Sequence, residues 1–401
     1  MTRVVITGAG AVSPYSTSLD GFWEALNGGS LHKQLELVAG YKARKLVDWE
    51  PHSIIGKKGI QFLQPSSKFL LAAGNLALQN AQLEENMPLP EHLGVVVGSN
   101  FAGLTTASNY DFSTITEGPH LVSPMQAPNV LANAPASNLG IRLQARAANI
   151  TVGNGQCAGI DAIGHAARLI KKNQANCVVV GGVAEINERI MKIYESLGII
   201  SVENEEYAGQ PYHPLSKGVV PGEGAAALVL ESYESAVQRN AAILGEVFDW
   251  TSLFCSENSF ERKSLCYSKA VANVLAKSEL TAEEIDLVFS SGNGCLKQDD
   301  VEANALVRNF GSKLPAVSAV KRSFGELYGA TGVFQAVGAV ESFRRNSGPS
   351  SAGFNGEHLY GQLENSMGSK EQRMADPRKA LLMCQDVFGA VSGVILSAYQ
   401  E

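Results

Sequence analysis

Short apolar, β-branched runs alternate with longer amphipathic stretches along this chain of 401 residues. The runs with strand character are residues 3–7, 93–97, 177–183, 226–230, 287–290, 316–320 and 394–397. The stretches with apolar residues three and four apart are 21–26, 67–83, 160–172, 264–278 and 332–344. Buried strands that alternate with helices are typical of sheets covered on both faces. The alternation therefore predicts an α/β fold.

Composition excludes several classes of function. The 45% hydrophobic content allows a large core, in two domains or in one double-sized α/β unit. The formal charge of −7 comes without a long Lys/Arg run, which argues against a nucleic-acid-binding surface. The chain opens directly into a strand, and no apolar run approaches the roughly 18 residues of a membrane helix. We therefore expect a cytoplasmic protein with neither a nucleic acid nor a membrane as partner.

Two strand endings, at residues 96–100 and 289–294, combine an apolar run with glycine, serine and asparagine. They lie about 190 residues apart. This echo suggests that the chain contains a duplicated unit.

The segment 153–164 predicts a tight turn from a strand into a helix. It follows the apolar run 148–152 and opens the helical stretch that begins at residue 160. Such a turn presents one side chain at the positive end of a helix, where backbone N–H groups stabilise a thiolate or an oxyanion. A cysteine in that place would be reactive, and a glutamine would not. The choice between Gln156 and Cys157 thus decides whether the chain carries a nucleophile.

Several segments together resemble the β-ketoacyl-acyl carrier protein synthases, and the resemblance covers nearly the whole chain. They are residues 3–14, 22–26, 98–99, 123–124, 159–168, 180–185 and 222–231. The resemblance implies a thiolase-like α/β fold in which two related βαβαβαββ halves form a five-layer αβαβα core. It implies an N-terminal half at residues 1–245 and a C-terminal half at residues 246–401.

The catalytic members of that family share three residues, and this sequence departs from all three. The family pattern has a Cys at the turn, a His in His-Gly-Thr, and a His in Gly-His after a Lys. Its thiolate accepts the acyl chain, and its histidines support decarboxylation and stabilise the enolate and oxyanion. Here Gln156, Ser291 and Glu326 occupy these positions, and only Lys321 is retained. The resemblance thus implies a degenerate site without a catalytic residue.

The distribution of histidines agrees with this interpretation. None of the seven lies between His213 and His358, the interval in which both family histidines would fall. His358 belongs to the polar stretch 346–377, which has no strand-end motif and is expected to be a surface loop. No imidazole base is therefore expected at the site.

Other charged residues near these positions have structural interpretations. Lys321 is expected to pair with Glu326 in the emptied pocket. Asp299 and Glu302, one helical turn apart, match family acids that orient backbone groups. Asp386 stands where the family has a gating Phe.

Residues 156–162 are similar to the Gln-Ala-Gly-Gly-Leu-Asp-Ala signature of chain length factors, the cysteine-less ketosynthase subunits of type II polyketide synthases. A carboxamide cannot form a thioester. The resemblance implies a non-catalytic subunit of a heterodimer in type II polyketide or polyene biosynthesis. Its partners would be a catalytic ketosynthase subunit, which condenses acyl and malonyl units, and the acyl carrier protein that holds those units. No cofactor or metal is implied, because the phosphopantetheine arm belongs to the carrier protein.

A stripe of residues at helical spacing is the candidate for chain-length control. Leu104, Ser108, Phe112 and Ile115 share one helical face, which is usually a core face. In chain length factors, the corresponding helix looks across the dimer interface into the partner's acyl tunnel, where bulky residues stop the growing chain. Tyr110 lies off the stripe and is a second candidate.

Two other functions stay open. The first is an enzyme by itself, either a β-ketoacyl synthase that uses Cys157 or a malonyl decarboxylase that uses Gln156. Against the first, Cys157 is expected to point about 100° away from the site around the helix start. Alternatively, the chain is a structural partner that stabilises a ketosynthase without touching the acyl chain.

Overall fold

A computed structural model describes residues 2–28, 35–84, 86–201, 207–311, 313–350 and 374–400. Within these ranges, none of the helices combines the length and the apolar character that a membrane crossing requires.

Ten strands form one continuous sheet, in the order β10-β9-β11-β12-β8-β1-β7-β6-β4-β5. Their bounds are β1 Val4–Val12, β4 Leu93–Gly98, β5 Asn149–Val152, β6 Cys177–Ala184, β7 Gly224–Ser232, β8 Gly245–Phe254, β9 Leu287–Phe289, β10 Ala316–Ser318, β11 Lys379–Gln385 and β12 Ala390–Ser397. A separate hairpin joins β2 (Glu36–Val38) to β3 (Tyr41–Ala43).

The strand order repeats between the two halves of the sheet. Within each half, from the outer edge inward, the strands stand third, second, fourth, fifth and first in chain order. The pairing senses repeat as well: β4 is parallel to β5 and β6, as β9 is to β10 and β11, and the remaining pairs are antiparallel. The halves meet where β1 pairs with β8. The expected duplication is confirmed.

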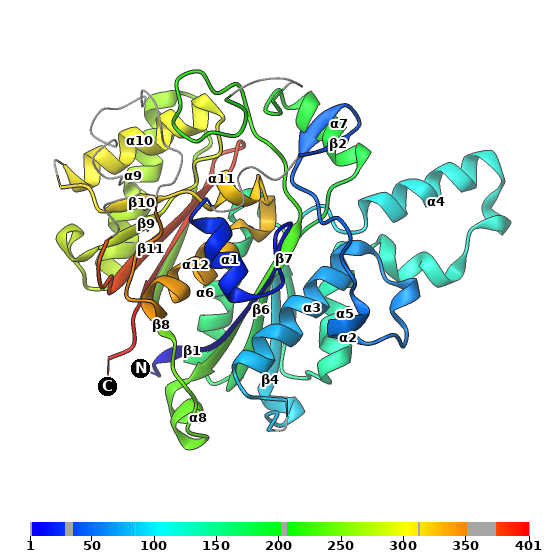
Figure 1. Cartoon of the computed structure of the whole chain (residues 1–401), viewed down its shortest axis with the longest axis horizontal. Helices are drawn as coiled ribbons and strands as arrows, with labels where there is room; N and C mark the ends of the chain where they lie inside the picture. Colours follow the sequence, from blue (N-terminus) through cyan, green and yellow to red (C-terminus); the bar gives the residue numbers. More distant parts are fainter. Residues whose placement is uncertain are drawn as a thin grey trace.

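Helices cover the sheet in three layers (Figure 1). One outer face carries α3 (Pro65–Asn80) and α5 (Ala134–Leu143), and the other carries α9 (Phe260–Lys277) and α10 (Leu296–Phe310). Between the two halves lie α6 (Ala158–Lys171) and α12 (Thr331–Arg344). The expected α/β fold with an αβαβα core is confirmed.

The remaining α-helices are α1 Leu19–Leu26, α2 His52–Ile55, α4 Leu104–Thr116, α7 Glu188–Ser196, α8 Tyr233–Gln238 and α11 Val320–Phe324.

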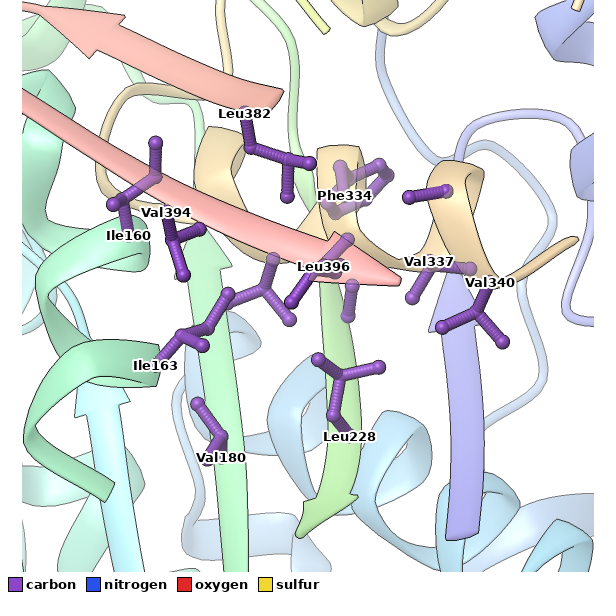
Figure 2. Packing of buried hydrophobic residues seen from close by; sticks show 14 of the residues in the cluster. Ile160, Ile163, Val180, Leu228, Phe334, Val337, Val340, Leu382, Val394 and Leu396 are labelled. Carbon is purple, nitrogen blue, oxygen red and sulfur yellow. The ribbon is translucent and has the colours of Figure 1, made fainter. Parts of the chain in front are cut away.

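The middle layer holds the largest apolar core. Figure 2 shows side chains of α6 and α12 packed between strands of the two halves. The labelled residues are Ile160, Ile163, Val180, Leu228, Phe334, Val337, Val340, Leu382, Val394 and Leu396. All are inaccessible to solvent, and burial of each such side chain stabilises the fold by about 1.5–3 kcal/mol.

Glycines let the N-termini of the two central helices touch. A Cβ on Gly159 of α6 would lie 2.8 Å from the carbonyl oxygen of Gly329, just before α12. A Cβ on Gly332 would likewise overlap the backbone of Ile160. Because both positions lack a side chain, the turn before α6 and the turn before α12 lie side by side. These turns carry Gln156 and Glu326, so the contact positions the candidate site.

Helix α4 projects from the body of the molecule (Figure 1). It packs mainly against two short 3₁₀ helices that follow it, η3 (Pro119–Leu121) and η4 (Pro124–Val130). We call residues 104–131 the arm. Phe112 and Ile115 are 62% and 83% exposed, so the interpretation of this stripe as core is wrong for these two residues within the single chain.

Strand β5 agrees with the strand expected at residues 148–152, whereas four strands escaped the sequence pattern: β8 and β11 of the large sheet, and β2 and β3 of the hairpin. Strand β8 carries Glu246, Asp249 and Thr251 among its apolar residues, which hides its strand character. Most of the polar stretch 346–377 falls on residues 351–373, outside the described residues.

Candidate functional site

Gln156 lies in the short helix η5 (Gly155–Cys157) that leads into α6, and its side chain is fully buried. Its amide nitrogen Nε2 donates to Oε2 of Glu326 at 2.6 Å. Its amide oxygen Oε1 accepts from Nε2 of Gln298 at 2.9 Å. Both polar ends of the carboxamide are therefore held, and the amide bridges the two halves of the fold.

Glu326 is the centre of this buried network. Lys321 Nζ lies 2.9 Å from Glu326 Oε2, and Asn293 Nδ2 donates to the same oxygen at 2.9 Å. The other oxygen accepts from the backbone N–H of Tyr328 at 2.9 Å. Burial lowers the pKa of the Lys321 ammonium, but the Glu326 carboxylate more than compensates and holds that pKa above its ordinary value. The ammonium is thus a structural cation here, paired with the Glu326 carboxylate.

Asp386 occupies the backbone donor at the start of α6. The N–H of Gln156 donates to Asp386 Oδ2 at 3.1 Å, and the N–H of Phe388 donates to Oδ1 at 2.8 Å. Asp386 also hydrogen-bonds the side chain of Tyr328. The positive helix end that would stabilise an oxyanion therefore already holds an anion, supplied by the chain itself.

Ser291 joins this region through its backbone. Its N–H donates to Glu302 Oε1 at 2.8 Å, and its hydroxyl accepts from the N–H of Gln385 at 3.2 Å. Asp299 accepts backbone N–H groups of Asn293 at 3.0 Å and of the next residue at 3.0 Å. Burial raises the pKa of Asp299 to about 7 and also raises that of Glu302. The two acids orient the backbone of the loop, as the sequence suggests.

Cys157 points away from this network. Its side chain is fully buried in the central apolar core, and Sγ contacts the carbonyl oxygen of Cys384 at 3.4 Å. Burial raises the pKa of its thiol well above the ordinary range. Because the thiolate is the nucleophilic form, this cysteine is inert in the folded chain.

Aromatic rings fill the space beside Gln156. Tyr328 stacks on Tyr194 with ring centroids 5.8 Å apart and meets Phe101 at 4.7 Å. The cavity that remains against these rings has a volume of about 10 Å³, barely enough for one water molecule.

Sequence reasoning missed the partners of the carboxamide. Gln298 and Asn293 complete the network, and Tyr194 and Phe101 close the adjacent space. One signal was available in the sequence, the polar cluster that follows β9; the φ of 46° at Tyr328, in the left-handed region, is visible only in the structure.

The candidate residues on the arm differ in burial and in the contacts that they make. Leu104 packs at the base of α4 against the apolar cluster around Tyr194, and Ser108 is half-buried. The Tyr110 hydroxyl hydrogen-bonds the carbonyl of Ser123. Phe112 and Ile115 face outward, as described above. None of these residues is among the hydrogen-bond partners of Gln156 that lie in the described part of the chain.

Family models match most of the chain. The model described as "Beta-ketoacyl synthase, N-terminal domain" matches residues 1–236, and the model described as "Beta-ketoacyl synthase, C-terminal domain" matches residues 256–355. The chain belongs to the β-ketoacyl synthase family.

Individual relatives agree with this assignment. A 3-oxoacyl-[acyl-carrier-protein] synthase 2 from Coxiella burnetii is 28% identical over 365 residues, covering 86% of this chain and 87% of its own. A putative polyketide beta-ketoacyl synthase 1 from Streptomyces halstedii is 26% identical over 420 residues and covers 98% of each chain.

Solved structures support the fold. The structure of the ishigamide ketosynthase/chain length factor matches with a TM-score of 0.87 at 20% identity, over 100% of both chains. A type II PKS ketosynthase in complex with its acyl-carrier protein matches with a TM-score of 0.82 at 20% identity, also over 100% of both chains. This member of the β-ketoacyl synthase family therefore has the thiolase-like fold, and its candidate site lies where the two central helices begin.

Proposed function

We propose that this chain is a chain-length-factor subunit: non-catalytic by itself, paired with a cysteine-bearing ketosynthase in type II polyketide or polyene biosynthesis. The partner would condense acyl and malonyl units carried by an acyl carrier protein. This chain would complete the acyl tunnel and limit product length. The observation that carries the proposal is the buried carboxamide of Gln156, held at both ends by Glu326 and Gln298.

Three features of the site favour a subunit without its own chemistry. A carboxamide stands at the nucleophile position, and a carboxylate occupies the backbone donor beside it. The Lys321–Glu326 ion pair replaces a base that could accept a proton.

The arm favours a role across an interface. Five large apolar side chains on the arm are more than half exposed, and exposed apolar patches are typical of protein–protein contacts. They are Phe112, Ile115, Leu121, Met125 and Leu131. A partner that covered this surface would place Phe112 and Ile115 against its own residues, as the resemblance to chain length factors implies.

Mass spectrometry separates this proposal from an autonomous synthase. The isolated chain is incubated with an acyl thioester of the acyl carrier protein, alone and together with a cysteine-bearing ketosynthase. We expect an acyl adduct only on the ketosynthase cysteine. An acyl adduct on Cys157 of the isolated chain would contradict the proposal, as would malonyl decarboxylation that depends on Gln156.

Product analysis separates chain-length control from simple scaffolding. Within the reconstituted pair, trimming Phe112 or Tyr110 to Ala should lengthen the products, and enlarging Ser108 to Phe should shorten them. Unchanged products from all three variants, with a normal rate of synthesis, would favour a structural partner that does not touch the acyl chain.

A further inference from the structure

A second buried polar site lies at the base of α4, separate from Gln156. A cavity of about 400 Å³ opens between the loop after β3, the start of α3, the first turn of α4 and the end of β6. We call it the carboxylate cavity. The residues that matter here are Phe62, Gln64, Phe69, Glu185, Asn187 and Glu223.

Two carboxylates line this cavity and are almost removed from water. Glu185 is 6% exposed and Glu223 is 3% exposed. Glu223 accepts the backbone N–H groups of Leu46 at 2.9 Å and Ile186 at 3.1 Å. Glu185 accepts the backbone N–H of Ser66 at 3.1 Å. Within the described ranges, neither carboxylate forms an ion pair with a basic side chain.

The two acids also act on each other. Burial, with a smaller contribution from the charge of Glu185, raises the pKa of Glu223 to about 7, against the two backbone N–H groups and the opposing charge of Lys45 on the cavity wall. Burial raises the pKa of Glu185 as well, although the Thr105 hydroxyl hydrogen-bonds it. Two desolvated carboxylates thus share one cavity in which a cation would stabilise their ionised forms.

Amide groups on the cavity wall provide an independent indication of a ligand. Gln64 is 8% exposed, and neither its Oε1 nor its Nε2 has a hydrogen-bond partner among the described residues. Asn187 uses its Oδ1 to cap α7, while its buried Nδ2 likewise has no partner there. Buried polar groups are normally satisfied, and leaving one unpaired destabilises the fold. A ligand with polar groups would remove that destabilisation.

We propose that the carboxylate cavity binds a small organic cation, with an ammonium or guanidinium group against Glu185 and Glu223. Its apolar body would lie along Phe62 and Phe69, and the Gln64 amide would complete the polar contacts. The volume suits a small molecule better than a bare ion. In the described part of the chain, no group of three or more His, Cys, Asp or Glu side chains could hold a metal ion. This site is independent of the proposed chain-length role.

Calorimetric titration of the full chain with n-butylammonium chloride tests the site. We expect saturable binding at pH 8 that weakens about tenfold at pH 6, because protonation of Glu223 removes the charge that the ligand needs. Binding at pH 7 should release about half a proton, measured as the dependence of the heat on the buffer's ionisation enthalpy. The isosteric neutral 1-butanol should not bind.

Variants locate the binding. Glu223→Gln should weaken n-butylammonium binding at least tenfold and remove its pH dependence. Glu188→Gln, an equal change of charge on an exposed neighbour, should leave binding as in the wild type. Proton release by the wild type tests the proposal even if Glu223→Gln does not fold.

Three results would overturn the proposal. One is equal binding of 1-butanol and n-butylammonium, which would indicate an apolar pocket. Another is cation binding that Glu188→Gln weakens as much as Glu223→Gln does. The third is binding of Mg²⁺ alone that displaces n-butylammonium, which would make this a metal site.

Discussion

The start of α6 and the arm around α4 differ in how far their side chains are buried and in whether these side chains have partners within the chain. At the start of α6, the side chain of Gln156 is fully buried and both ends of its amide have partners within the chain. On the arm, Phe112 and Ile115 are 62% and 83% exposed. The first region is complete in the single chain, whereas the second exposes apolar surface that a partner could cover.

The contrast lies in where the side chains find their partners. At the start of α6, Gln156 and Lys321 both bind Glu326 within the chain, so the polar groups of this site satisfy one another. The arm keeps large apolar residues without an internal partner, which costs solubility unless another surface covers them. Three experiments test whether the start of α6 and the arm act independently, the first in stability and the second in association.

The largest effect is expected at Glu326. Glu326→Gln leaves the buried Lys321 ammonium without its carboxylate, and breaking one partner of a buried ion pair costs about 3–5 kcal/mol. Chemical denaturation followed by circular dichroism should show this loss as a lower unfolding midpoint.

The matched control is the double variant Lys321→Met with Glu326→Gln, which removes both charges and should recover most of the stability. If Glu326→Gln unfolds like the wild type, the ion pair is not what holds the site together.

The fold could be predicted well from the sequence, because each strand and helix has its own local apolar pattern and this pattern repeats along the chain. Alternating apolar runs identified seven strands, although β8 with its polar residues Glu246 and Asp249 was hidden. Gln156 and Glu326 were found because each stands in a recognisable motif. Their contact, 170 residues apart in the chain, depends on the meeting of α6 and α12, which no local pattern encodes. Gln298 and Tyr194 were missed for the same reason.

The next effect is expected on the arm, and on association rather than folding. In the variant with both Phe112→Asp and Ile115→Asp, the free energy of unfolding of the isolated chain should change by less than about 1 kcal/mol, because both side chains are exposed. Binding to the ketosynthase should weaken by about 2 kcal/mol or more, roughly 30-fold, as for interface hot spots. Sedimentation velocity at several concentrations measures both the oligomer and its affinity.

Phe254→Asp is the control for this variant, because Phe254 is 67% exposed at the end of β8, outside the arm. It should not alter association. A double arm variant that still binds the ketosynthase with wild-type affinity would show that the interface lies elsewhere.

The smallest effect is expected on the pKa of a thiol placed at the start of α6, where Asp386 sets the local electrostatic field. Gln156→Cys places a thiol at the positive end of the helix, but the Asp386 carboxylate accepts the same backbone N–H. A neighbouring negative charge raises a thiol pKa, so the added Asp386→Asn should lower the pKa of the new thiol by about one unit. The thiolate absorbance near 240 nm of each variant, minus that of the chain with Gln156, measures this pKa between pH 6 and pH 10 without a reagent that must reach the buried site.

Asp111→Asn on the exposed face of α4 removes one negative charge at a distance and should leave the thiol pKa unchanged. Equal pKa values with Asp386 and with Asn at that position would mean that the carboxylate does not govern this helix end. The loss of reactivity would then rest on Gln156 alone. A shift of the expected size would instead show two separate blocks, a missing nucleophile and an occupied anion position, so that restoring the cysteine by itself would not restore a reactive site.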